Sequence, residues 1–294
     1  MVRYAGQEKF VELDGNRICY IDEGEGPPLL FVHGIGGSIS NWAPSIEHFK
    51  RRYRVIALDL PGFGKSGYAD ADYSLEFFTR AIRGLLAHLG IDRVSIVGNS
   101  LGGFITLHIA LYHNELVETI TLVDSAGGHE FPVLARRALR VLPLNWLKRI
   151  ILFINSYLLR FRFAYRLGGI YNINPYTRAL LDEAISMAER TDVDQYLEAY
   201  VRTARTALNV TYREQLGEIC KPTLVVWGQK DLGVPLKVGQ RINTGIKGSF
   251  LVAIPRAAHV PQLDQPEAFN AALERFLSGV RNSGSPDQSN GEVS

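Results

Sequence analysis

The chain has 294 residues, of which 46% are hydrophobic and 21% charged, which is ordinary for a folded protein and excludes an intrinsically disordered chain. Its formal net charge of +2 is too small to indicate binding of nucleic acid. The two cysteines, Cys19 and Cys220, lie far apart without metal-ligand spacing, which predicts two buried thiols and neither a disulfide nor a metal site. No apolar run reaches the roughly eighteen residues of a membrane span, and we expect a cytoplasmic protein.

The apolar pattern predicts eight strands. Residues 8–13 and 16–22, separated by Asp14 and Gly15, alternate as an antiparallel hairpin does. Six further segments are short and continuously apolar and end in glycine or a polar turn, which is typical of strands buried on both faces. They are PLLFVHG (28–34), RVIALDLPG (54–62), RVSIVGNS (93–100), ETITLVDSAG (118–127), PTLVVWGQKD (222–231) and SFLVAIPRAAH (249–259).

Helical patterns lie between these strands, for example at 74–89 and 266–280, where apolar residues recur at spacings of three and four. Such alternation predicts an α/β fold, a doubly wound and mostly parallel eight-stranded sheet. Asp264, shortly before Pro266, is expected to cap the last helix rather than to take part in catalysis.

One long helical segment interrupts the alternation after the sixth strand. It predicts a core in two parts, 1–127 and 218–281, with a helical cap at 128–217 and a polar, disordered tail at 282–294. Within the cap, residues 131–181 contain nine lysines and arginines and no acidic residue. We expect its apolar side chains to pack on the core and line an apolar pocket, and its cations to form a solvated face without stable membrane association.

Ser100 stands at the turn between a buried strand and a helix, in Gly98-Asn99-Ser100-Leu101-Gly102. The small residues allow a tight and strained turn that exposes the serine hydroxyl at the carboxyl end of the strand. Ligands of open α/β sheets bind at that edge, and the free N–H groups of the following helix point to it. The pattern therefore predicts a nucleophile at Ser100.

A serine nucleophile needs a base and a group that orients the base. Of the seven histidines, only His259 directly follows the last strand and precedes a helix, whereas His108 and His113 lie in helical patterns. Asp231 follows another buried strand and is the first choice for the orienting acid. Asp124, which also ends a strand between the serine and the histidine, is its rival.

The chain resembles the α/β-hydrolases that carry a helical cap, from about residue 8 to 281. The resemblance rests on HGIGG (33–37), DLPGFGKS (59–66), GNSLGG (98–103), WGQKD (227–231) and AAHVPQLDQPEAF (257–269), in that order. It implies that Ser100, Asp231 and His259 are a catalytic triad. It also implies an oxyanion hole formed by the backbone N–H groups of Ile35 and Leu101, with His33 holding its loop in place.

These roles predict a serine hydrolase that cleaves carboxylic esters of small apolar substrates through an acyl-enzyme, without a metal or other cofactor. The glycines of DLPGFGKS lack the spacing that cradles phosphates, so a nucleotide is not expected. The motif GNSLGG, with Asn99 directly before the serine, also resembles the carbon–carbon bond hydrolases that cleave ring-fission products of aromatic compounds. The loop HGIGGSISNW lacks their usual proline, and no cap arginine matches their substrate-binding one. A ligand receptor that retains the triad is a third reading.

Overall fold

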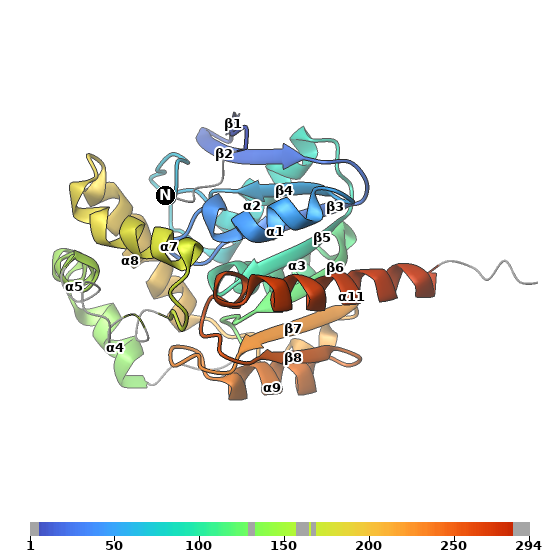
Figure 1. Cartoon of the computed structure of the whole chain (residues 1–294). Coiled ribbons are helices and arrows are strands. Elements are labelled where there is room, and N and C mark those ends of the chain that lie inside the picture. The colour runs from blue at the N-terminus through green and yellow to red at the C-terminus, as the bar shows by residue number, and fades with distance from the viewer. Residues whose placement is uncertain (1–5, 129–132, 157–164, 166–168, 285–294) are drawn as a thin grey trace, which may run out of the picture.

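The computed structural model describes residues 6–128, 133–156, 165 and 169–284. Eight strands form one sheet in the order β1-β2-β4-β3-β5-β6-β7-β8. The hairpin β1–β2 is antiparallel, β2 pairs antiparallel with β4, and the remaining neighbours are parallel. The predicted α/β class and mostly parallel eight-stranded sheet are confirmed (Figure 1).

The strands fall where the apolar runs predict them. Their bounds are β1 (Lys9–Leu13), β2 (Asn16–Glu23), β3 (Pro28–Val32), β4 (Arg54–Leu58), β5 (Val94–Asn99), β6 (Val117–Val123), β7 (Thr223–Gly228) and β8 (Phe250–Ile254). Every residue of β5 and β7 is buried, because helices cover both faces of these central strands. β8, at the edge of the sheet, is more exposed.

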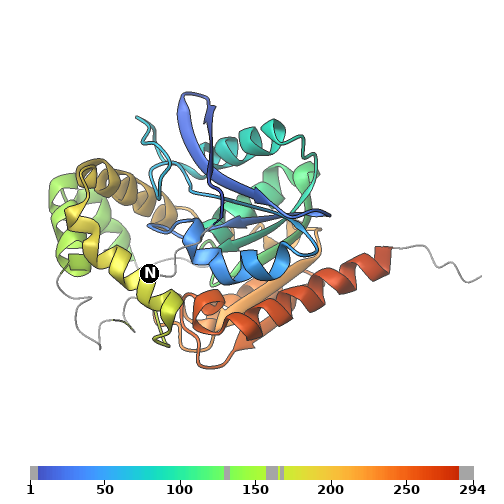
Figure 2. The ribbon, with the colours of Figure 1, turned by 45° about the horizontal axis from the view of Figure 1, so that its top comes forward.

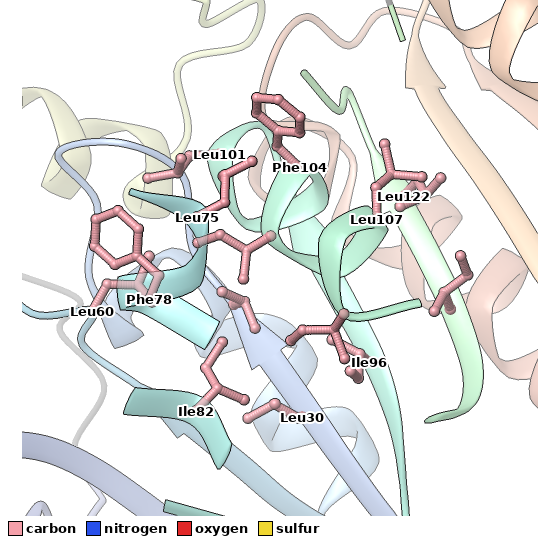
Figure 3. Close-up of a cluster of buried hydrophobic side chains, with 14 of the residues drawn as sticks. Leu30, Leu60, Leu75, Phe78, Ile82, Ile96, Leu101, Phe104, Leu107 and Leu122 are labelled. Atoms are coloured by element: carbon pink, nitrogen blue, oxygen red, sulfur yellow. The ribbon is translucent and has the colours of Figure 1, made fainter. Parts of the chain in front are cut away.

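One face of the sheet is covered by α2 (Leu75–His88), α3 (Leu101–Tyr112) and α9 (Leu236–Gly245). Figure 3 shows side chains of α2 and α3, such as Phe78 and Phe104, above Leu30 of β3 and Ile96 of β5. The other face is covered by α1 (Ala43–Phe49) and α11 (Pro266–Gly284), which contact each other. The apolar spacing of 74–89 thus marks the face of α2 that packs on the sheet.

The structure corrects two expectations. The last helix, α11, continues to Gly284, so residues 282–284 belong to it rather than to a disordered tail; the remainder of the predicted tail, 285–294, lies outside the described residues. Cys19 is buried as expected, but Cys220 is exposed, because it lies in the loop that precedes β7 rather than in the sheet.

Between β6 and β7 the described chain is helical. It contains α4 (Val133–Val141), α5 (Leu144–Ser156), α7 (Pro175–Ile185), the short η4 (Ser186–Glu189) and α8 (Val193–Asn209). Figures 1 and 2 show these helices together at one end of the sheet. The Tyr212 N–H and the Thr211 hydroxyl both donate to the carbonyl of Gly127, so the chain leaves this segment beside the place where it enters. The domain boundaries at 128 and 217 stay a prediction.

The apolar side chains of α4 and α5 do not all pack inward as expected. Leu147 is buried, and Ile151 and Leu152 pack against the main core. Other large apolar side chains of these two helices are exposed, namely Val133, Val141, Trp146, Ile150, Phe153 and Ile154. Only some of the apolar side chains of α4 and α5 therefore pack inward as expected. Among the described residues, no helix is both long and apolar enough to cross a membrane.

Gly102 is predicted to be essential for packing α3 onto the sheet. A Cβ atom on Gly102 would lie 2.1 Å from the carbonyl oxygen of Val32, and backbone cannot move aside as a flexible side chain can. We expect Gly102→Ala to lower the free energy of unfolding by about 1–3 kcal/mol or more, measured by urea denaturation.

The matched control is Gly84→Ala in α2, where the new Cβ would meet Leu13 at 3.4 Å, an ordinary contact. We expect this change to be neutral or to stabilise the protein by up to about 1 kcal/mol, because glycine is unfavourable inside a helix. Equal effects of the two substitutions would contradict the packing explanation.

Candidate active site

Ser100 occupies a sharp turn between β5 and α3. Its backbone angles, φ 54° and ψ −110°, lie in a region that L-residues rarely adopt. Gly98 and Gly102 make the turn possible: a Cβ on Gly98 would lie 2.3 Å from the carbonyl oxygen of Gly102. The Ser100 N–H donates to the carbonyl of Val123 at the end of β6, so the turn is tied to the neighbouring strand. The strained serine predicted from the sequence is present.

The loop after β3 lies against this turn. A Cβ on Gly34 would be 3.2 Å from the Cβ of Ser100, which places the loop that contains Ile35 beside the serine. Within the described part of the chain, the N–H groups of Ile35 and Leu101 donate no hydrogen bond. Both donors are thus available for a ligand. Their role as an oxyanion hole stays a prediction.

His33 holds this loop in place. Its Nδ1 is 2.7 Å from the carbonyl oxygen of Gly34, and its Nε2 accepts a hydrogen bond of 2.9 Å from the Leu60 N–H. Complete burial lowers the pKa of His33 to about 4, so the ring is neutral at pH 7 and donates through Nδ1. With both nitrogens engaged by backbone groups, His33 connects two loops and cannot act as a base.

Asp231 and His259 are hydrogen-bonded to each other. Asp231 Oδ2 lies 2.6 Å from His259 Nδ1, and its Oδ1 accepts from the N–H groups of Gly233 and Val234. Burial alone raises the pKa of Asp231, but the hydrogen bond and the charge of His259 outweigh it and hold that pKa below its usual value. An ionised Asp231 orients the imidazole with Nδ1 protonated, which leaves Nε2 as the free base.

Asp124, the rival acid, lies behind this pair. It is fully buried, and its carboxylate accepts from the Gly228 N–H at 3.1 Å. Burial and the nearby charge of Asp231 raise the pKa of Asp124 well above its usual value, which favours a protonated carboxyl group that donates to Asp231. Both acids therefore belong to the site, but only Asp231 contacts the histidine. The three groups also have metal-ligand proximity, which we interpret as an acid pair with its histidine.

The sequence analysis gave Asn99 no structural role. The Asn99 side chain is buried, and its Nδ2 donates to the carbonyls of Val123 and His259 at 3.1 and 3.0 Å. It thus connects the serine turn to the histidine loop. Among the described residues the Ser100 hydroxyl forms no hydrogen bond, so the structure joins Ser100 and His259 through this asparagine and not directly. In the sequence, the only sign of this role of Asn99 is its position directly before the predicted nucleophile.

Asp264 has a structural role, but not the expected one. It ends the short helix α10 (Pro261–Asp264), and its carboxylate accepts from the N–H groups of Ala258, Tyr171 and Asn172. These donors belong to the His259 loop and to the helical segment and not to α11, so Asp264 fastens the two together rather than capping the last helix. Burial raises its pKa to about 6.

Aromatic residues of α8 lie over the loop after β3. The Tyr196 hydroxyl donates to the Gly36 carbonyl at 3.2 Å, and a Cβ on Gly36 would lie 3.0 Å from the Tyr200 ring. Arg190 stacks on the Tyr196 ring and is paired with Asp192 at 2.8 Å. The side of the site that faces the helical segment is therefore aromatic, and the charge of Arg190 is already balanced.

The sheet, the strained serine turn and the Asp231–His259 pair together define a hydrolase-type scaffold. The family model described as alpha/beta hydrolase fold matches residues 27–266, and the chain belongs to this family. The resemblance noted in the sequence is thus confirmed.

Several relatives extend over nearly the whole chain. A 2-hydroxy-6-oxononadienedioate/2-hydroxy-6-oxononatrienedioate hydrolase of Cupriavidus pinatubonensis is 32% identical, over 93% of this chain and 96% of its own. The 2-hydroxy-6-oxo-6-(2'-aminophenyl)hexa-2,4-dienoic acid hydrolase of Metapseudomonas resinovorans is 30% identical, over 92% and 91%. Among solved structures, a membrane phospholipase A, a bacterial virulence factor, is 26% identical with a TM-score of 0.77, over 94% of this chain and 87% of its own.

Asn99 is predicted to hold the His259 loop in position. Asn99→Ala leaves the His259 carbonyl without its donor, which we expect to cost about 1–3 kcal/mol in the free energy of unfolding. Hydrogen exchange of the amides of Ala258 and His259 should become faster than the global loss of stability explains. The exposed Asn114→Ala is the control and should change neither quantity. Unchanged exchange at 258 and 259 in Asn99→Ala would refute the connection.

Proposed function

We propose that this protein hydrolyses a carbon–carbon bond beside a ketone in a 2-hydroxy-6-oxodienoate-type compound, with Ser100, His259 and Asp231 as its triad. The observation that carries this proposal is the identity of 30–32%, over more than nine-tenths of the chain, to hydrolases named for such compounds. These substrates contain no ester or amide bond. The bond to be hydrolysed in them is therefore the carbon–carbon bond next to the 6-oxo group.

The site supplies the groups that such a reaction requires. His259 Nε2 takes the proton of Ser100, whose oxygen attacks the C6 carbonyl, and the N–H groups of Ile35 and Leu101 stabilise the oxyanion. Before the C5–C6 bond can break, the proton of the 2-hydroxyl group moves to C5, which converts the dienol into a ketone at C2. When the C5–C6 bond then breaks, its electron pair passes through the C3=C4 double bond to the C2 oxygen, which takes the proton held by the histidine. Water then attacks the acyl-enzyme, so that its hydroxyl ends on the acyl group and a proton returns to Ser100.

A carboxylic ester with an apolar acyl group is the second candidate. A dienoate substrate carries a carboxylate and needs a positive partner, but Arg190, a cation beside the aromatic side of the site in the described part of the chain, is paired with Asp192. An uncharged ester needs no such partner, and the aromatic rings of Tyr196 and Tyr200 suit an apolar group. The similarity to a membrane phospholipase A, whose substrate class contains acyl esters, also favours this candidate.

A paired assay distinguishes the two substrates. We expect kcat/KM for a 2-hydroxy-6-oxodienoate to exceed that for a short p-nitrophenyl ester by at least about tenfold, a difference of about 1.4 kcal/mol in transition-state stabilisation. The loss of the dienoate chromophore and the release of p-nitrophenol are followed with the same enzyme. The Ser100→Ala variant is the control that must abolish either activity. Turnover of the ester alone would replace the first candidate by the second.

Substitution of the two acids tests the roles within the site. We expect Asp231→Asn to lower kcat by about three orders of magnitude or more, because the imidazole loses the group that fixes its tautomer. Asp124→Asn should lower it by less than about tenfold, because the asparagine N–H can replace the hydroxyl by which the protonated Asp124 donates to Asp231. Steady-state kinetics with the better of the two substrates measures both.

The reverse ranking of these two variants would assign the orienting role to Asp124. Labelling with an organophosphonate, followed by mass spectrometry, provides a test that needs no substrate. A folded protein in which Ser100 resists every such reagent would favour the ligand-receptor reading over the enzyme.

A further inference from the structure

Three potential metal ligands lie together on the sheet face that α2 and α3 cover. Glu76 is in the first turn of α2, His108 is in α3, and His113 follows the last residue of α3. Glu76 Oε2 is 3.2 Å from His108 Nε2 and 3.4 Å from His113 Nε2. One ligand atom from each of the three residues lies within 4.8 Å of the others. From the sequence the two histidines are expected to be ordinary helix residues, because nothing in the sequence brings Glu76 next to them.

These separations suit a tetrahedral ion. Ligand atoms about 2.0–2.2 Å from Zn²⁺ are roughly 3.3–3.5 Å apart in a tetrahedron. The distances from Glu76 to the two imidazoles already have this length, so an ion between them requires little movement. The histidine side chains are 13% and 18% exposed and that of Glu76 is 46% exposed, so solvent can reach the fourth position.

The surroundings orient the first histidine. Nδ1 of His108 is 2.5 Å from the hydroxyl of Tyr212, on the chain segment that leads from α8 to β7. A histidine that binds a metal through one ring nitrogen usually donates the other N–H to a nearby acceptor. The Tyr212 hydroxyl can be that acceptor, because a phenol both donates and accepts.

The same groups also form a complete arrangement without an ion, in which both Nε2–H groups donate to Glu76 and Tyr212 donates to His108 Nδ1. Binding of an ion moves each imidazole proton from Nε2 to Nδ1 and reverses the Tyr212 hydrogen bond. Nδ1 of His113 then faces Glu115, whose carboxylate lies 3.9 Å away on an exposed side chain that is able to rotate closer.

We propose that Glu76, His108 and His113 bind a divalent transition-metal ion, Zn²⁺ in the first place, with Tyr212 as the residue that orients His108. Two imidazoles and one carboxylate are a ligand set suited to Zn²⁺. The site is separate from Ser100, which precedes the first residue of α3, whereas His108 lies two helical turns further on. Its ion links α2 to α3 and, through Tyr212, to the chain leaving the helical segment.

The test uses tag-free full-length protein, stripped with EDTA and titrated with Zn²⁺ by calorimetry. We expect one Zn²⁺ per chain at this site, and at least about a hundredfold weaker binding in Glu76→Gln and in His113→Ala. Tyr212→Phe should weaken binding by about 10- to 100-fold, as loss of an orienting partner does. Glu76→Gln keeps a side chain of the same shape and an acceptor oxygen, so it reports on binding even if His113→Ala folds poorly.

Two controls keep the site distinct from others. His88→Ala removes a histidine at the end of α2, the helix that contains Glu76. This residue lies beside Tyr20, and its loss should leave the affinity for Zn²⁺ unchanged within about twofold. His259→Ala removes the histidine of the other group with metal-ligand proximity and should also leave it unchanged. Co²⁺ in place of Zn²⁺ should give the visible absorption of a tetrahedral site. Unchanged affinity in Glu76→Gln, loss of binding in His259→Ala, or no binding at all would overturn the proposal.

Discussion

The turn at Ser100 is the constraint around which the site is assembled. A non-glycine residue with a positive φ and an outward hydroxyl is held there because the first turn of α3 packs directly on the ends of β5 and β3. That close approach leaves no room for a side chain at Gly98 or Gly102. Strain of this kind persists only when the surrounding contacts over-determine it, and here they include a backbone hydrogen bond to β6.

The parallel order of the strands then decides what meets the serine. β3 and β6 flank β5, so the loop after β3 brings Gly34 to one side of Ser100, and the end of β6 brings Asp124 to the other. β7 comes next, and with it Asp231. Asn99 completes the connection by donating to the backbone of both the β6 end and the His259 loop. A single buried amide thus fixes the distance between two parts of the chain 160 residues apart.

Two carboxylic acids side by side in the interior would repel each other if both were ionised. The structure avoids this by giving them unequal surroundings. Asp231 collects two backbone N–H donors and the imidazole, so it keeps the charge, whereas Asp124 has a single backbone N–H donor and keeps its proton. These surroundings favour Asp231, the first choice from the sequence, as the orienting acid, because it contacts His259 whereas burial raises the pKa of Asp124.

The fold and the strand-end residues could be predicted because they depend on local patterns. Continuous apolar runs mark buried strands, and each candidate residue stands directly after such a run, where parallel strands share an edge. The role of Asp264 was predicted wrongly in part, since its carboxylate accepts from the loop N–H groups of Ala258 and Asn172 rather than from the helix that follows it in the sequence. Asn99 and the group formed by Glu76, His108 and His113 depend on contacts between distant segments, which no periodicity records.

The choice between the two candidate substrates concerns the helical segment between β6 and β7, where sequence patterns predict least about the site. In the proposed mechanism the serine, histidine and acid act on a carbonyl carbon, and the same chemistry can cleave a carbon–carbon bond or an ester. The two candidate substrates differ in charge, and Arg190, a cation beside the site, belongs to the helical segment rather than to the sheet. In the helical segment the spacing of apolar residues predicts which side chains face inward. It does not predict whether Arg190 is available to an anion, because that depends on Asp192, to which Arg190 is hydrogen-bonded. An anionic substrate would therefore have to compete with Asp192 for Arg190, whereas an uncharged ester would not.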